Sequence, residues 1–161
     1  MKKFLVQFVA LIIVIAGALL FYTGSDPSLP FIFEQAKYND LTINETKLKV
    51  EIADTQEKRS KGLGGREKLA SDEGMLFIFQ KVDKHSFWMK GLKFSLDFIW
   101  IKDDLVVDIL PNVPPPVVGA TDESLPIYQP RVEIDTVLEV NGGVVERLKI
   151  KIGDTIKLTP L

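Results

Sequence analysis

A carboxylate stands inside the most aromatic stretch of the chain. Residues 85–101 read HSFWMKGLKFSLDFIWI and place Asp97 among large apolar side chains. If residues 95–101 form a β-strand, alternate side chains point to opposite faces, and both faces are apolar apart from Asp97. This pattern predicts a central strand with a carboxylate at the edge of the core.

A buried carboxylate needs a partner or takes up a proton. Arg59, Arg66 and Lys90 are the cations available to Asp97. The simpler interpretation is a structural ion pair that ties a helix to the sheet, because breaking such a pair costs about 3–5 kcal/mol. The alternative is a pocket carboxylate that pairs with an arginine and holds a polar ligand. The ligand-binding residues predicted for that pocket are Arg66, Trp88, Met89, Lys90, Asp97 and Glu139.

Glu139, within VLEV, is a second carboxylate inside a predicted strand. Together with Asp97, at a separation of about 5–9 Å, it could act as acid and base in glycan cleavage. The sequence alone does not bring the two residues together. A salt bridge or a solvated position is the ordinary role of such a residue.

The sequence gives little support for other kinds of catalytic site or for a metal site. The chain has no cysteine and one histidine, which excludes thiol catalysis, Fe–S clusters and cysteine zinc sites. Met75, His85 and Met89 could bind Cu(I) outside the cytoplasm, but methionines between apolar strand residues usually fill the core. No serine lies in a G-x-S-x-G motif. We therefore predict no catalytic residue, no metal and no cofactor.

The first 22 residues are typical of a membrane segment. After Met1-Lys2-Lys3, the run FLVQFVALIIVIAGALLFY contains Gln7 as its one strongly polar residue, and it is long enough to span about 30 Å of hydrocarbon. The lysines would keep the N-terminus in the cytoplasm. A signal peptide cleaved near residues 16–18 is the alternative, although the apolar run continues past that point. We expect a single-pass protein of the cell membrane with its domain on the extracytoplasmic side, or a secreted or periplasmic domain after cleavage.

The rest of the chain divides into a tether over residues 23–40 and one domain over residues 41–161. Acidic and basic residues nearly balance, with a formal net charge of −2 and no basic block. Nucleic acid is therefore not an expected partner. The expected partners are the membrane, through the N-terminal helix, and a small polar ligand or an envelope protein.

The domain is predicted to be α+β and mostly β, a small curled antiparallel or mixed sheet or barrel with one or two short helices. A hairpin is expected around Asn44-Glu45, and a capping box formed by Asp54 and Glu57 would begin a helix that ends at Gly62. Further strands are expected over residues 74–79, 86–90, 95–101, 105–110, 135–140 and 148–158. Residues 111–131 contain six prolines and predict a long loop, which in a compact domain is usually functional or disordered.

Four blocks of sequence, in order, resemble the domain-of-unknown-function 192 (DUF-192) family over roughly residues 48–158. They are VEIADTQEKRSKGLGGREKLASDEGMLFIF, FWMKGLKFSLDFIWI, VLEV with the glycine pair after it, and IKIGDTIKL. The resemblance implies a small β-rich domain, often exported in bacteria and archaea, without an established activity. The family pattern falls on Gly62, Arg66, Gly74, Met75, Phe87, Trp88, Met89, Leu96, Asp97, Glu139, Gly153 and Asp154. The chain departs from it at Gly64, where the family usually has methionine, and at Ser95, where it commonly has proline.

The function predicted from these features is a membrane-anchored, non-catalytic ligand-binding or accessory module of the cell envelope. In this hypothesis Asp97 and Arg66 support a pocket near Trp88, and the proline-rich loop forms its rim. An envelope glycan hydrolase or lyase that uses Asp97 and Glu139 is one alternative. A structural partner of a membrane complex, acting through residues 111–131, is the other.

Overall fold

A computed structural model describes residues 38–159 of the chain. The predicted membrane segment over residues 1–22 and most of the predicted tether lie outside these residues. Within residues 38–159, no helix is long and apolar enough to cross a membrane. The first strand begins at Tyr38, three residues before the domain boundary expected from the sequence.

The domain is a mixed seven-stranded sheet, which confirms the mostly β prediction. Its spatial order is β5-β4-β6-β3-β2-β1-β7, with β2 and β3 parallel and the other neighbouring strands antiparallel. The strands are β1 (Tyr38–Ile43), β2 (Thr46–Ala53), β3 (Glu73–Asp83), β4 (Leu96–Lys102), β5 (Leu105–Val113), β6 (Ile134–Asn141) and β7 (Ile156–Thr159). The helical segments are α2 (Gln56–Lys61), the 3-10 turn η1 (Asp122–Ser124) and α3 (Val144–Leu148).

The sheet curls until its two edge strands meet at one end. Val106 N–H donates to the Asp154 carbonyl at 2.8 Å, and Gly153 N–H donates back to the Val106 carbonyl at 2.9 Å. Ile156 N–H donates to the Asp104 carbonyl at 2.9 Å. These bonds pair part of the edge of β5 with the segment that leads into β7, so that this edge is not left open to other chains.

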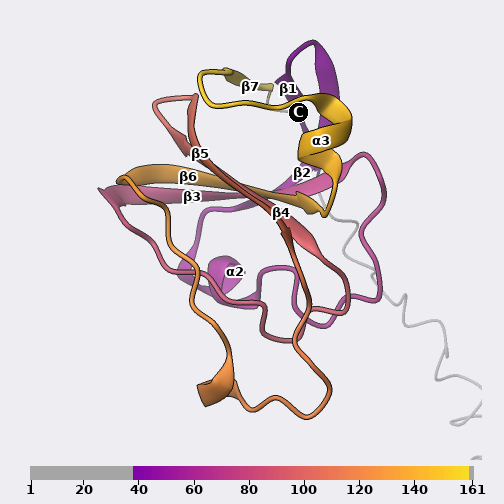
Figure 1. The fold of residues 1–161 in the computed structure, drawn as a ribbon. Helices are drawn as coiled ribbons and strands as arrows, with labels where there is room; N and C mark the ends of the chain where they lie inside the picture. Colours follow the sequence, from indigo (N-terminus) through magenta and orange to yellow (C-terminus); the bar gives the residue numbers. More distant parts are fainter. Residues whose placement is uncertain (1–37, 160–161) are drawn as a thin grey trace, which may run out of the picture. The chain divides into compact units, whose positions relative to one another are not determined.

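The two faces of the sheet carry separate apolar cores, and Figure 1 shows α3 and α2 on opposite sides of the central strands. The first core lies inside the curl, where residues such as Leu76, Ile99 and Leu138 pack under Val144 of α3. The second core is aromatic and contains Phe77, Phe87, Met89, Phe98 and Trp100. Both faces of β4 are therefore buried, as the apolar run around Asp97 predicts.

Local turn chemistry explains most of the connections. Asn44 and Glu45 join β1 to β2 with φ of 47° and 64°, and Asp103 and Asp104 join β4 to β5 with φ of 50° and 63°. Paired left-handed residues match the twist of a two-residue hairpin. Gly62 ends α2 with φ of 49°, as predicted.

Four sequence predictions about these elements are wrong in detail. Thr55, not Asp54, caps α2, because its hydroxyl accepts the N–H of Lys58 at 3.2 Å. Residues 86–90 form no strand, and Phe87 makes an isolated bridge to Tyr128. The last strand is limited to β7, since residues 149–155 turn instead. β5 runs on through Pro111 to Val113, where the register shifts between its pairs with Leu96 and Phe98; a proline is tolerated at such a bulge.

Asp97 ties three parts of the domain together through backbone groups. Its side chain is fully buried. One carboxylate oxygen accepts the N–H of Asn112 at 2.8 Å and of Gly143 at 3.1 Å, and the other accepts the N–H of Val145 at 2.7 Å. The bulge in β5 is what turns Asn112 toward the carboxylate, while Gly143 and Val145 belong to the beginning of α3.

The predicted ion pair of Asp97 is therefore wrong. Arg66 pairs with Glu51 and Lys90 with Asp122, while Arg59 donates to backbone carbonyls. A carboxylate that accepts several N–H groups is satisfied without a cation, because each of these dipoles stabilises the negative charge. The sequence pattern could not show this, since the three donors come from chain segments that only the fold brings to β4.

Replacing Asp97 with asparagine should destabilise the domain by about 2–4 kcal/mol, because the amide NH₂ faces an N–H donor and the charge that strengthens all three bonds is lost. Urea unfolding of the full chain, followed by circular dichroism, measures the change. Asp135→Asn is the matched control. Asp135 accepts one backbone N–H, from Asp103 at 3.0 Å, and its replacement should cost under about 1 kcal/mol. Equal stabilities of the two variants would contradict the role assigned to Asp97.

Candidate functional site

The candidate site is built around Glu139, on the aromatic face of the sheet. In the register of the strands, Glu139 of β6 lies between Met75 of β3 and Phe98 of β4. Its side chain is 5% exposed. Among residues 38–159 it has no hydrogen-bonding or ion-pairing partner, and burial raises the pKa of its carboxyl group to about 8. Glu139 is therefore mainly protonated at neutral pH.

A cavity of about 620 Å³ opens above this carboxyl group. Its walls come from α2 with the glycine-rich turn after it, from β3, and from the segment 85–92. The volume falls in the range of small-molecule sites, about 300–1,000 Å³. Glu139 is the acidic residue of its lining.

Aromatic side chains form much of the cavity wall. Phe79 stacks on His85, with ring centroids 3.7 Å apart and an interplanar angle of 10°. Phe77 and Phe87 meet edge to face at 5.2 Å. Trp88 is 45% exposed at the cavity. Such walls suit a flat or apolar body, which gains both from burial and from ring contacts.

The glycine-rich turn lets two backbone segments approach closely beside the cavity. Gly65 N–H donates to the Gly91 carbonyl at 2.9 Å. A Cβ atom on Gly64 would lie 3.1 Å from the Lys90 carbonyl oxygen and 3.3 Å from that of Lys61. A larger residue at position 64 would therefore press against the backbone of both walls. This turn ends the helix, as predicted, and also shapes the cavity.

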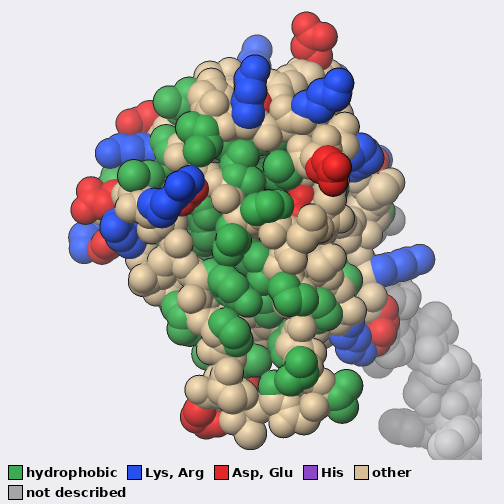
Figure 2. Space-filling view, viewed as in Figure 1, with side chains coloured by type: hydrophobic (Ala, Val, Ile, Leu, Met, Phe, Trp, Pro, Cys, Tyr) green, Lys and Arg blue, Asp and Glu red, His purple; other side chains and the backbone are tan. Residues whose placement is uncertain are grey.

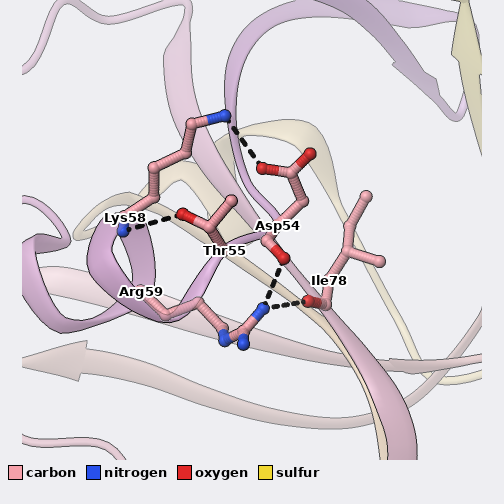
Figure 3. Close-up of polar contacts among 5 residues, drawn as sticks. All are labelled: Asp54, Thr55, Lys58, Arg59 and Ile78. Carbon is pink, nitrogen blue, oxygen red and sulfur yellow. Dashed lines mark hydrogen bonds and ion pairs between the residues drawn. The ribbon is translucent and has the colours of Figure 1, made fainter.

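Arg59 is the cation that the structure fixes in the cavity wall. Figure 3 shows its guanidinium reaching from α2 to two backbone carbonyls, those of Asp54 and Ile78. Both bonds use Nη1, at 2.8 and 2.9 Å. The group also lies 5.3 Å from the ring centroid of Phe79. Because α2 is a helix, Gln56, Arg59 and Ser60 share the face that lines the cavity.

The structure brings together three of the six residues predicted as ligand-binding, namely Trp88, Lys90 and Glu139. Lys90 pairs with Asp122 of η1 and lies over the Trp88 ring at 5.2 Å. The other three lie outside the cavity lining. Arg66 makes a bidentate pair with Glu51 at 2.5 and 2.8 Å, Met89 packs in the aromatic core, and Asp97 holds the backbone groups described above.

Two further predictions about this site are wrong. Asp97 and Glu139 cannot share a cleft, because Asp97 points to the face of Ile99 and Ile101 whereas Glu139 shares the face of Phe98. The acid–base pair of the hydrolase alternative is therefore absent from this sheet. The proline-rich loop contributes no residue to the cavity lining. It packs behind the cavity wall, through the Phe87–Tyr128 bridge and the bond from Gln129 to Ser86 at 2.7 Å.

The residues considered as Cu(I) ligands each have other neighbours in the structure. Met75 and Met89 are buried in the aromatic core, and His85 Nε2 lies 2.8 Å from the Lys81 carbonyl oxygen. Within the part of the chain that the structure describes, no group of three or more metal-binding His, Cys, Asp or Glu side chains occurs.

Sequence reasoning missed Arg59, Phe79 and His85 as neighbours in one wall. Arg59 was visible only as a possible partner of Asp97. Its spacing from Gln56 and Ser60 does indicate a common helical face, but nothing in the spacing indicates that this face meets β3 and the segment 85–92. The contact depends on the parallel pairing of β2 and β3, which places α2 as a crossover on the aromatic face.

Comparison with known proteins identifies one family and two solved structures that this chain resembles. A family model named DUF192, described as "Uncharacterized ACR", matches residues 39–158. No curated protein matches the chain. A crystal structure from Sinorhizobium meliloti 1021, described as "a putative transcription regulator", has a TM-score of 0.67 and 29% identity, over 75% of this chain and 93% of that one. A protein of unknown function from Novosphingobium aromaticivorans DSM 12444 has a TM-score of 0.66 and 30% identity, over 74% and 84% of the two chains.

The buried Glu139 predicts a stability that depends on pH. In the unfolded chain this carboxyl loses its proton near 4.5, whereas in the folded domain it does so near 8. Between these values the folded state binds the extra proton, so the stability that Glu139 contributes is fully present below about pH 4.5 and is lost as the pH rises to about 8. Glu139→Gln should remove this dependence and stabilise the domain by about 3–5 kcal/mol at pH 9, since each pKa unit is worth about 1.4 kcal/mol.

Urea unfolding of the full chain between about pH 5 and pH 9 measures this difference. Glu146→Gln, a change at an exposed glutamate of α3, is the control and should leave the pH profile unchanged. Parallel profiles for the unmodified chain and Glu139→Gln would show that Glu139 is ionised without cost in the folded state, and would contradict the burial argument.

Proposed function

The chain belongs to the DUF192 family, and we propose that this member is a non-catalytic binding module whose cavity over Glu139 holds a small organic molecule. The observation that carries the proposal is a carboxyl group that is almost fully buried, has no protein partner among residues 38–159, and lines a cavity. No buried side-chain oxygen or nitrogen of the described residues lacks a hydrogen-bond partner, so the Glu139 carboxyl oxygens reach the solvent of the cavity. A ligand in the cavity can therefore replace water as the hydrogen-bonding partner of Glu139.

Binding is preferred to catalysis because acid–base chemistry needs two positioned groups or a nucleophile with its base. Among the residues that line the cavity, Glu139 has the one carboxyl group. His85 already stacks on the Phe79 ring and lies within hydrogen-bonding distance of the Lys81 carbonyl oxygen. An aromatic cavity with a small number of polar side chains in its wall is the usual pattern of a recognition site.

We further propose that residues 1–22 anchor this module in the cell membrane, with the domain on the extracytoplasmic side. The lysines at the start of the chain and the long apolar run after them support the proposal. In this arrangement the cavity would meet molecules of the envelope or the medium.

A structural partner role in a membrane complex remains the second candidate. Val117, Val118 and Ile127 of the proline-rich loop are 79%, 106% and 58% exposed. Figure 2 shows apolar side chains along the middle of one face and down to this loop at the bottom of the view. These features favour a contact surface, but they specify no partner chemistry, whereas the cavity does. The binding function is therefore our conclusion.

The binding function can be tested by filling the cavity. Ser60→Trp places a large side chain on the cavity side of α2, where Ser60 is exposed and lines the wall. A library of small aromatic and polar fragments is screened by ligand-observed NMR against the full chain held in lipid nanodiscs. Fragments that bind the unmodified chain should lose at least about tenfold in affinity against Ser60→Trp, because the cavity that would bury them is occupied.

Glu57→Trp is the matched control, since Glu57 lies on the same helix, is exposed, and does not line the cavity. Its fragment affinities should equal those of the unmodified chain. A screen without hits, or hits that bind Ser60→Trp and Glu57→Trp equally well, would overturn the binding function.

The anchor has its own test. Full-length chain expressed in a bacterial host should remain in the membrane fraction after washing with alkaline carbonate, and its mass should include residues 1–22, because the apolar run is longer than the cleavable core of a signal peptide. Recovery of a shortened chain in the soluble fraction would establish the signal-peptide alternative.

A further inference from the structure

The cavity lining carries more basic than acidic side chains, and this excess of positive charge indicates a class of ligand. The inference rests on the proposed binding function. The charged and titratable groups that line the cavity are Arg59, Lys61, His85, Lys90 and Glu139. Three of these are cations at neutral pH, and the one carboxyl group is buried where its ionised form is disfavoured.

The part of the cavity wall formed by Glu139 offers hydrogen bonds but no net charge. Glu139 is flanked by Met75 and Phe98, and no cation is paired with it among the described residues. In its acid form the carboxyl group carries one O–H donor and retains an acceptor oxygen. It therefore matches a hydroxyl, amide or ring nitrogen at the end of a neutral, apolar ligand body.

The cavity wall also carries a cation, Arg59, that the protein itself does not neutralise. Arg59 forms no ion pair with any described residue, because its partners are the neutral carbonyls of Asp54 and Ile78 and a long contact of 3.5 Å from Nη2 to the Gln56 amide oxygen. Asp54, the neighbouring carboxylate, pairs with Lys58 instead. With Nη1 used for anchoring, the edge formed by Nε and Nη2 is left with no carboxylate of its own.

This arrangement resembles a prepared anion site. A guanidinium held by the backbone has already lost the rotamer freedom that binding would otherwise remove. Lys61 is exposed and has no ion pair among the described residues, so it adds positive charge to the same wall. Lys90 contributes less, because Asp122 already pairs with it.

We infer that the cavity takes an organic anion: a flat apolar body held between the aromatic walls, a hydroxyl or similar polar group at Glu139, and a carboxylate or phosphate at Arg59. An amine in the same orientation would meet the uncompensated charge of Arg59 and Lys61. An amine turned the other way would require Glu139 to ionise in its apolar surroundings, which is unfavourable. Neutral analogues would keep the wall contacts and lose the charge-assisted bonds.

Three compounds that share one 4-hydroxyphenyl body separate these cases. They are 3-(4-hydroxyphenyl)propionate as the anion, 4-ethylphenol as the neutral analogue and tyramine as the cation. Isothermal titration calorimetry on the full chain in lipid nanodiscs should give the propionate an affinity at least about tenfold above that of 4-ethylphenol, as one charge-assisted bond is worth about 1.5–3 kcal/mol. Tyramine should bind most weakly.

Arg59→Gln should reduce the affinity of the propionate to that of 4-ethylphenol in the same variant, so that the preference for the anion is lost. Arg147→Gln is the matched control. Arg147 also donates to a backbone carbonyl, that of Ser71 at 2.7 Å, but lies outside the cavity lining. Its replacement should leave the preference for the anion intact. Circular dichroism confirms that each variant is folded, and the comparison of the three compounds on the unmodified chain needs no variant.

Equal or tighter binding of tyramine or 4-ethylphenol, or no binding of the propionate, would overturn the assignment of an anionic ligand. So would a preference for the propionate that persists in Arg59→Gln. If the fragment screen nevertheless yields hits that Ser60→Trp abolishes, the cavity binds a ligand of another class and the proposed function stands. If that screen also fails, both proposals fall.

Discussion

The fold of this domain depends on one carboxylate that is satisfied by backbone groups. Asp97 lies in a strand with both faces buried, and it receives N–H groups from the bulge of β5 and from the first turn of α3. These two segments would otherwise leave buried donors without partners, at a cost of about 1–3 kcal/mol each. Asp97 therefore fixes where β5 bends and where α3 covers the first core. Close packing at this point also explains why residue 142 is a glycine, since a Cβ atom there would lie 2.4 Å from the Ser95 hydroxyl oxygen.

The same strand order creates the cavity on the other face. Alternation along β6 sends Leu138 and Val140 into the first core and Glu139 toward the aromatic one. Nothing in the described domain compensates this second carboxyl group, so its pKa rises to about 8. The buried acidic residues of β4 and β6 thus have different surroundings: Asp97 is hydrogen-bonded to three backbone N–H groups, while Glu139 faces the cavity.

The cavity wall is assembled from parts that also stabilise the domain. Arg59 links α2 to β3 through its hydrogen bond to the Ile78 carbonyl. The Phe79 ring stacks on the His85 ring and also contacts the Arg59 guanidinium. The proline-rich loop holds the segment 85–92 from behind, through Tyr128 and Asp122. Because the walls are built from packed strands and anchored side chains, the cavity is formed before any ligand arrives, which lowers the entropic cost of binding.

The sequence by itself determined the periodic and local features of this protein. Apolar residues on both faces identified the central strand around Asp97, Asn44-Glu45 identified a hairpin, and Gly62 identified the end of α2, because each depends on a few consecutive residues. It also identified Glu139, Trp88 and Lys90 as candidates. Only the tertiary structure decided what these side chains meet. It placed Asp97 on backbone donors rather than on Arg66, separated Asp97 from Glu139 by the sheet, and brought Arg59 to the aromatic wall. Those outcomes depend on strand order, a β-bulge and a parallel crossover. Because these features join residues far apart in the chain, no periodic pattern in the sequence indicates them.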